Sequence, residues 1–248
     1  MRILIACEYS GTVRDAFIRA GHHAVSCDLL PTDSPGIHYQ GKVENLLDGW
    51  EPVQFQGQCD PDGNGYCEVI EDDPNNCLCI GPTMDDHEYI EIDGEMFGRP
   101  IDSPHWDLMI AFPPCTDLSV SGAKHFAVKI ADGRQQRALD FVQLLMNASI
   151  DKIAIENPIG VISSKIRKPD QIIQPYHFGH EATKSTCLWL KGLPLLVPTN
   201  VVGKGNRHVT KSGKSLPEWY NLPPSVDRWK IRSKTFQGIA DAMACQWS

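Results

Sequence analysis

The first 28 residues, MRILIACEYSGTVRDAFIRAGHHAVSCD, decide the fold. Arg2–Ala6 is a short apolar run that suits a buried strand. After a Ser-Gly turn, apolar side chains recur at helical spacing over Thr12–Ala20, and Gly21 is a natural stop for that helix. Ala24–Cys27 indicates a second strand, which ends at Asp28. A strand, a glycine turn, a helix, a strand and an acid in this order predict a βαβ unit.

The same alternation returns later in the chain. We expect a strand over Asp107–Phe112, a helix over Arg134–Ala148 and a strand over Lys152–Ile155. Because strands that alternate with helices imply a parallel, doubly wound sheet, the predicted fold class is α/β with a Rossmann-like sheet. The remainder is expected to contain a strand over Thr186–Leu190, loops over 198–232 and a final helix over Ile239–Trp247.

The charge of the chain is unevenly distributed. Its formal net charge is −8, from 31 acidic and 23 basic side chains, which by itself argues against an electrostatic binder of nucleic acid. Residues 51–110 hold 15 acidic side chains and one basic one, whereas residues 161–248 hold 13 basic and five acidic ones. The excess of acidic side chains therefore lies within residues 51–110. A nucleic-acid or nucleotide substrate for the basic remainder of the chain is electrostatically reasonable.

Hydropathy and cysteine usage indicate an intracellular protein. No apolar run reaches the ~18 residues that a membrane span needs, and charge interrupts the first residues too soon for a secretory signal. Nine cysteines in such a chain are unlike a disulfide framework. We expect a cytoplasmic location, which would be the host cytoplasm if a phage encodes the protein.

An acidic insertion over residues 51–104 is expected to interrupt a domain made of residues 1–50 and 105–248. It contains four cysteines with the spacing C-x7-C-x9-C-x-C, namely Cys59, Cys67, Cys77 and Cys79. Four thiols in a segment this polar could bind a structural Zn²⁺, with His87 as a substitute ligand, although zinc ribbons have paired C-x2-C spacing. The alternative is free or partly buried thiols in a surface hairpin.

Two residues at expected strand ends carry the chemistry. Cys115 follows two prolines that fix the backbone ahead of the thiol, and Glu156 directly follows an apolar strand, where desolvation can raise its pKa. Each has an ordinary structural explanation when taken alone: a buried cysteine, or a glutamate that caps the next element. Together they suit covalent activation of a pyrimidine, in which the thiolate adds to C6 while the acid protonates N3, so that C5 can attack an electrophilic methyl group.

These residues resemble the motifs of one enzyme family. Pro113-Pro114-Cys115, with Ser119 four residues later, resembles the catalytic Pro-Cys loop of cytosine-C5 DNA methyltransferases, and Glu156-Asn157-Pro158 resembles their Glu-Asn-Val motif. Ser10-Gly11 is similar to their Gly-rich opening, and Ser233–Ala244 looks like their C-terminal motif, which returns to the cofactor. The chain is most similar to short phage-type members, over about 1–50, 105–190 and 233–248.

The resemblance implies S-adenosyl-L-methionine as cofactor and methylation of cytosine C5 in DNA through a covalent Cys–C6 adduct. It implies catalytic roles for Cys115, Glu156 and Asn157. On the cofactor side it implies Glu8, Tyr9, Ser10, Gly11, Asp28, Pro113 and Gln237. On the substrate side it implies Pro114, Ser119, Lys184 and Thr186.

Departures from the family pattern leave the substrate open. Thr116 replaces the usual Gln, and Thr183-Lys184-Ser185-Thr186 is the nearest substitute for a missing Gln-x-Arg-x-Arg motif, where Lys184 would serve the pyrimidine carbonyl or a phosphate. The basic, substrate-facing region 161–232 is small, so the substrate is duplex DNA, single-stranded DNA or a free pyrimidine nucleotide such as dCMP. A non-catalytic module that binds nucleic acid or a protein is a further alternative. Oligomeric state does not follow from the sequence.

Overall fold

The computed structural model describes residues 1–53, 87–210, 212–217, 225 and 228–248. The chain divides into two units, one made of Met1–Val43 and Trp106–Ser248 and the other of Glu44–His105. Each unit has a sheet of its own. No helix within the described ranges is long and apolar enough to cross a membrane.

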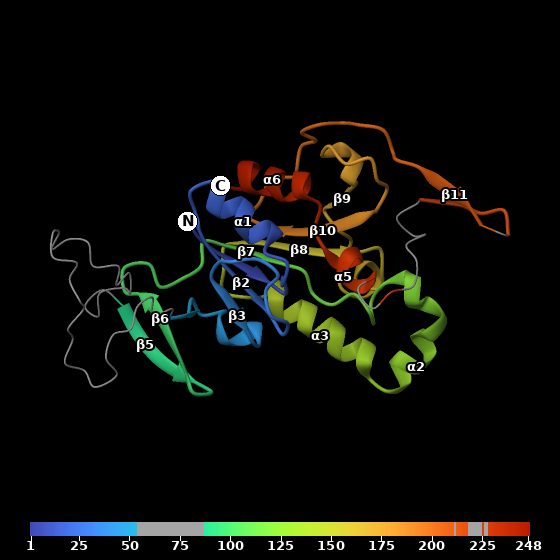
Figure 1. Ribbon diagram of the computed structural model, residues 1–248. Coiled ribbons are helices and arrows are strands. Elements are labelled where there is room, and N and C mark those ends of the chain that lie inside the picture. Colours follow the sequence, from blue (N-terminus) through green and yellow to red (C-terminus); the bar gives the residue numbers. More distant parts are fainter. Residues whose placement is uncertain (54–86, 211, 218–224, 226–227) are drawn as a thin grey trace. The chain divides into compact units, whose positions relative to one another are not determined.

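The larger unit is built on a seven-stranded sheet with the order β3-β2-β1-β7-β8-β10-β9 (Figure 1). Its strands are β1 (Arg2–Ala6), β2 (His23–Asp28), β3 (His38–Gln40), β7 (Leu108–Ala111), β8 (Lys152–Pro158), β9 (Gln171–Ile173) and β10 (Thr186–Lys191). The first five in spatial order are parallel to one another, which confirms the α/β class with a largely parallel, Rossmann-like sheet. The chain fills one side of the sheet with β2 and β3 and then crosses to β7, so the strand order reverses between β1 and β7.

The predicted parallel sheet has one exception, strand β10. This strand is antiparallel to both β8 and β9, and it lies between them. The alternation rule assumes a crossover helix between consecutive strands. Only a short 3-10 turn, η3 (Pro175–His177), lies between β9 and β10, so the chain can return in the opposite direction.

Helices cover both faces of this sheet. Helices α1 (Thr12–Arg19) and α6 (Gln237–Gln246) pack against each other over one face, and α3 (Arg134–Met146) covers the other (Figure 1). Successive side chains of β1 point to opposite faces of the sheet, so Ile3 and Ile5 lie on the same face. They pack with Phe17 and Met243 in one core, and all four side chains are fully buried. The remaining short helices are η1 (Val43–Asn45), η2 (Val120–His125), α2 (Phe126–Ala131), α4 (Ile162–Lys165) and α5 (Arg228–Ser233).

Several expected elements differ from the structure in their bounds or their type. Strand β8 continues beyond Ile155 to Pro158, because the antiparallel strand β10 supplies pairing partners as far as Thr186. Helix α6 begins at Gln237, two residues earlier than expected. The loops expected over 198–232 contain a hairpin of β11 (Arg207–Val209) and β12 (Ser215–Pro217), together with α5.

The smaller unit contains a three-stranded antiparallel sheet of order β4-β6-β5. Its strands are β4 (Glu51–Pro52), β5 (His87–Ile92) and β6 (Glu95–Pro100). Phe97 is fully buried, and Arg99 pairs with Glu88 at 2.6 Å while its guanidinium lies 4.3 Å from the centre of the Trp50 ring. Burial of an aromatic ring and a cation–π contact stabilise this unit.

Candidate active site

The carboxyl ends of β2, β1, β7 and β8 lie along one edge of the sheet and carry the predicted site residues. In open α/β sheets, ligands bind outside these ends, where the strand order reverses. That point lies here between β1, which is followed by residues 7–11, and β7, which is followed by residues 112–115. The site is therefore expected to have one side formed by β2 and β1 and another formed by β7 and β8.

The turn after β1 requires a glycine. Gly11 has a φ of 69° and forms the N-cap of α1. A Cβ at this position would lie 2.0 Å from Ser34 Oγ and 2.6 Å from Arg14 Nη2, so any side chain would displace both. The positive φ and the close approach are two independent reasons for glycine.

Glu8 caps helix α1 from inside the protein. Its carboxylate accepts hydrogen bonds from the backbone N–H groups of Val13 at 2.8 Å and Arg14 at 3.2 Å, and from the Ser10 hydroxyl at 3.1 Å. Burial raises the pKa of Glu8, and the bonds from the two N–H groups oppose that rise. In dinucleotide-binding folds this helix end binds the pyrophosphate. Here a carboxylate of the protein occupies it, which disfavours a phosphorylated cofactor.

Two other cofactor-side residues lie at the same edge. Asp28 ends β2, half-buried, and its Oδ1 accepts a hydrogen bond from the Leu30 N–H at 3.0 Å. Burial raises the pKa of its carboxyl group. The Tyr9 hydroxyl donates to the carbonyl of Lys230, 2.9 Å away, so the loop after β1 contacts the C-terminal part of the chain.

The loop that carries Cys115 is fixed from within. Two backbone N–H groups, of Leu118 and Ser119, donate to the Cys115 carbonyl at 3.1 and 2.9 Å. The buried Asn157 amide donates to the Pro113 carbonyl at 2.7 Å, which ties the end of β8 to the turn ahead of the thiol. Cys115 itself is exposed, as a nucleophile must be. Asn157 therefore positions the cysteine loop through a backbone contact.

A close backbone approach joins this loop to the chain after β8. Val161 N–H donates to the Leu118 carbonyl at 2.9 Å, and Ser119 forms an isolated β-bridge with Gly160. A Cβ on Gly160 would lie 2.2 Å from the Leu118 carbonyl oxygen. Because the conflicting atom belongs to the backbone, a side chain at 160 would force the two loops apart.

Glu156 and Cys115 interact electrostatically. Burial raises the pKa of Glu156, while the positive charge of Lys184 and a hydrogen bond with the Thr186 side chain lower it. Desolvation and the negative charge of Glu156 raise the pKa of the Cys115 thiol, whereas Lys184 and Arg232 lower it. The structure thus brings an exposed thiol, a carboxyl group and an ammonium group together.

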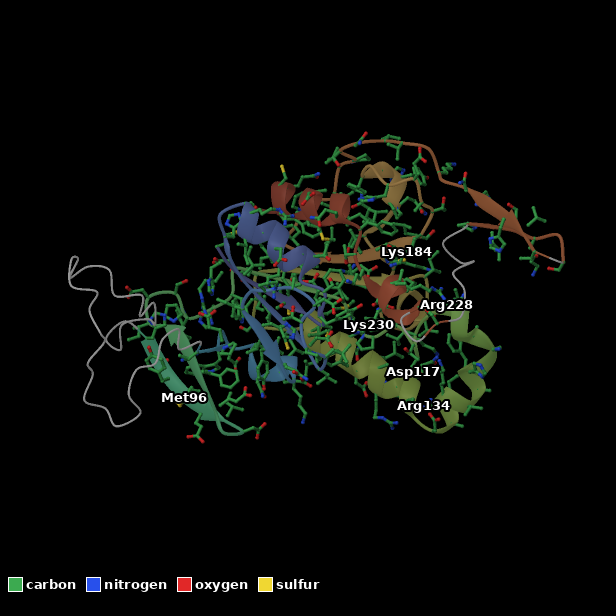
Figure 2. All side chains as sticks on the ribbon, in the orientation of Figure 1. Met96, Asp117, Arg134, Lys184, Arg228 and Lys230 are labelled. Carbon is green, nitrogen blue, oxygen red and sulfur yellow. The ribbon has the colours of Figure 1, made fainter. Side chains whose placement is uncertain are left out.

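Lys184 and Glu156 line the same cleft. Lys184 Nζ donates to the carbonyl of Arg232 at 3.0 Å, and Figure 2 shows Lys184 beside α5, which carries Lys230 and Arg228. The cleft contains about 290 Å³ of space without protein atoms, part of it open to solvent. It is lined by Phe112, Glu156, Lys184, Thr186, Ser233, Thr235, Phe236, Ile239 and Met243.

Other predicted residues are engaged elsewhere or are exposed. Ser119 is buried, and its hydroxyl caps η2 by accepting from the Ser121 N–H at 3.3 Å. Gln237 is exposed and donates to Asp241 at 2.8 Å, within its own helix. Pro114 is exposed next to Cys115.

The contacts of Arg232 and Phe236 with Lys184 were not predicted from the sequence. Arg232 is the last residue of the basic region 161–232, and Phe236 lies within the stretch Ser233–Ala244 that resembles the family's C-terminal motif. Both residues therefore belong to segments that the sequence analysis singled out, but no local pattern pairs them with Lys184.

The predicted zinc ligands Cys59, Cys67, Cys77 and Cys79 lie outside the described residues. The substitute ligand His87 is described, as the first residue of β5. Among the residues that the structure describes, no group of three or more His, Cys, Asp or Glu side chains could hold a metal ion.

Comparison with known proteins yields a distant structural likeness. No family model and no curated protein matches the chain. One similar solved structure, from E. coli, is described as a "putative DNA modification methyltransferase encoded within prophage". It is 14% identical with a TM-score of 0.42, and the match covers 82% of this chain and 52% of that one. The chain thus spans about half the length of the structure it matches, and the likeness carries no argument about function.

Proposed function

We propose that the protein is an S-adenosyl-L-methionine-dependent methyltransferase that modifies cytosine at C5 in DNA. The observation that carries the proposal is the pairing of the exposed Cys115 thiol with the Glu156 carboxyl group at the carboxyl ends of two adjacent strands. A nucleophile and an acid in this arrangement suit a pyrimidine, which has an electrophilic C6 and a basic N3.

The residues at the ends of β1 and β2 fit this cofactor. Glu8 already accepts hydrogen bonds from the N–H groups at the start of α1, so this helix end does not need a phosphate as acceptor. S-adenosyl-L-methionine contains no phosphate. Asp28 offers a carboxylate at the end of β2, where an acid holds a ribose hydroxyl in nucleotide-binding folds. The bound cofactor would supply an electrophilic methyl group.

The protein's own groups would drive the reaction by moving two protons. The Cys115 thiolate forms a bond to C6, and the π electrons of the C5–C6 double bond become available at C5. Glu156 donates its proton to N3. C5 would then use its electron pair to bond the methyl group, while the cofactor's sulfur keeps the electrons of the bond that breaks. C5 loses its own proton to a base and the C6–sulfur bond breaks to release the thiolate. N3 returns its proton to Glu156, which restores the neutral ring and the carboxylic acid.

The electrostatics of the site suit the acid role of Glu156 directly, whereas desolvation and the charge of Glu156 raise the pKa of Cys115 and oppose its thiolate form. Burial holds the Glu156 carboxyl protonated at a higher pH than usual, as a proton donor requires. Protonation of Glu156 also removes a negative charge from beside Cys115, which favours the thiolate. Lys184 and Arg232 favour the thiolate further. One proton on Glu156 therefore serves the acid and the nucleophile together.

Basic side chains near the C-terminus favour DNA over a small substrate. Exposed basic side chains occur in and beside the β11–β12 hairpin, at Lys204, Arg207 and Lys214. Cations of this kind bind phosphates along a strand without reading sequence. A duplex substrate would need its target base flipped out of the stack to reach Cys115.

Tritiated S-adenosyl-L-methionine, offered with duplex DNA, single-stranded DNA or dCMP, tests the proposal. We expect methyl incorporation into DNA, at C5 of cytosine after digestion to nucleosides. Incorporation into dCMP alone would replace DNA by a nucleotide as substrate. Absence of incorporation into all three, in protein that binds the cofactor, would contradict the proposal and favour a non-catalytic module.

The variant Cys115→Ser should abolish incorporation and keep cofactor binding. Cys245→Ser is the matched control, because Cys245 is also exposed but lies in α6. Glu156→Gln should lower the rate by roughly 10²- to 10⁴-fold, the usual contribution of a positioned acid.

A further inference from the structure

A C-terminal segment from Arg228 to Phe236, which we call the latch, contacts both ends of the candidate site. On the cofactor side, the Tyr9 hydroxyl donates to the Lys230 carbonyl at 2.9 Å and lies 3.1 Å from Ser233 Oγ. The tyrosine belongs to the loop after β1 and the latch lies more than 200 residues later. Tyr9 therefore fixes the latch against the cofactor end of the sheet.

On the other side, the latch holds Lys184. Lys184 Nζ donates to the Arg232 carbonyl at 3.0 Å and lies 5.9 Å from the centre of the Phe236 ring. The charge of Lys184 acts on both Glu156 and Cys115. A lysine ammonium sits on a flexible four-carbon stem, so its place is set by the acceptors around it. Here one acceptor is a backbone carbonyl of the latch.

We propose that Tyr9 is a positioning residue for Lys184: by fixing the latch, its hydroxyl holds the Arg232 carbonyl where it keeps the Lys184 ammonium beside Cys115 and Glu156. The biological meaning of this linkage rests on the proposed function, but the linkage itself belongs to the free protein. It connects the cofactor end of the site to the thiol end through Tyr9, the latch and Lys184. A displacement of Tyr9 when a cofactor binds would move the ammonium that faces the thiol.

The test is the rate at which iodoacetamide alkylates Cys115 in the full chain, followed by peptide mass spectrometry so that each cysteine is resolved. The rate is measured across a series of pH values in the absence of cofactor and DNA. Lys184→Gln removes the ammonium and should slow alkylation roughly fivefold on the rising part of the profile, the size of one charge contact at about 4 Å in water.

Tyr9→Phe removes only the hydroxyl and should slow alkylation in the same direction, by roughly twofold, as the loss of one hydrogen bond allows. Ser233→Ala removes a second polar partner of that hydroxyl and provides a second variant if Tyr9→Phe does not fold. The matched control is Tyr39→Phe, because Tyr39 is a buried tyrosine in β3. It should leave the profile unchanged.

The double variant Tyr9→Phe/Lys184→Gln decides whether the two residues act through each other. We expect it to match Lys184→Gln alone, because the tyrosine has no ammonium left to position. Additive effects, or a wild-type profile in both Tyr9→Phe and Ser233→Ala, would overturn the proposal. Methyl transfer is scored separately, so loss of the linkage in an active enzyme and presence of the linkage in an inactive one are distinguishable outcomes.

Discussion

Arg14 should contribute more to stability than any exposed charge in its helix. Its side chain is fully buried in α1 and donates to Asp15 at 2.8 Å, to Ser26 at 3.1 Å and to Ser34 Oγ at 2.7 Å. It also donates to the backbone carbonyls of Ser34 and Pro35, at 3.1 and 2.6 Å. We therefore choose Arg14→Met, which keeps an unbranched side chain and removes the donors.

The magnitude follows from the groups left behind. Each buried polar group without a partner costs about 1–3 kcal/mol, and breaking a buried charge pair costs about 3–5 kcal/mol. Asp15 is one-third exposed, so water can solvate part of what is lost. We expect Arg14→Met to lower the free energy of unfolding by about 3–5 kcal/mol, which corresponds to a fall in Tm of roughly 6–20 °C for a chain of this size.

Arg19→Met is the matched control, because it makes the same substitution in the same helix. Arg19 pairs with Asp241 at 3.0 Å, with both side chains more than half exposed. An exposed pair contributes less than about 1 kcal/mol, so Tm should fall by under ~4 °C. Both variants are measured by urea unfolding and by thermal melting. Equal effects of the two substitutions would refute the reasoning, since Arg14 is buried and makes several hydrogen bonds whereas Arg19 is exposed.

Three further predictions concern the site. Gly160→Ala should lower methyl transfer by roughly 10²-fold, because the new Cβ conflicts with the Leu118 carbonyl and displaces the Cys115 loop; Gly203→Ala is the control, and equal rates in both would contradict this account. Burial raises the folded-state pKa of Glu156, so its contribution to stability is present at low pH and is lost as pH rises through that pKa; Glu156→Gln should flatten this part of the stability curve from urea titrations, and an unchanged pH dependence would argue against a raised pKa. DNA carrying 5-fluorocytosine should form a covalent complex with the wild-type enzyme on a denaturing gel, because fluorine cannot leave C5 as a proton does; a complex with Cys115→Ser would remove Cys115 as the nucleophile.

The sequence predicted the parts of the fold that follow from local periodicity. β1, α1, β2, β7 and α3 each have a clear apolar pattern, and all five lie at or close to the expected residues. The direction of β10 could not be predicted, because a buried strand has the same apolar pattern whichever way it runs. The hairpin β11–β12 could not be predicted either, because its residues are largely exposed and form no apolar pattern.

The candidate site was predictable where a residue directly follows a strand. Glu8 and Cys115 follow β1 and β7, Asp28 ends β2 and Glu156 lies near the end of β8, and the parallel strands bring those ends to one edge. The contributions of Arg232 and Phe236 depend on a contact with Lys184 across about 50 residues of chain, which no local pattern records. The capping role of Glu8 was likewise hidden, because it depends on the conformation of the turn and not on residue type.

The packing of α6 on α1 has a consequence for how the protein folds during its synthesis on the ribosome. Ile239 and Met243 complete the core beneath the first helix. Tyr9 forms its hydrogen bond with Lys230, which lies 221 residues further along the chain. Chains emerge from their N-terminus, so the first half of the sheet has an uncovered apolar face until Ile239 and Met243 have been synthesised. The surroundings of Cys115 are consequently completed only after the latch has emerged, more than 100 residues behind the thiol.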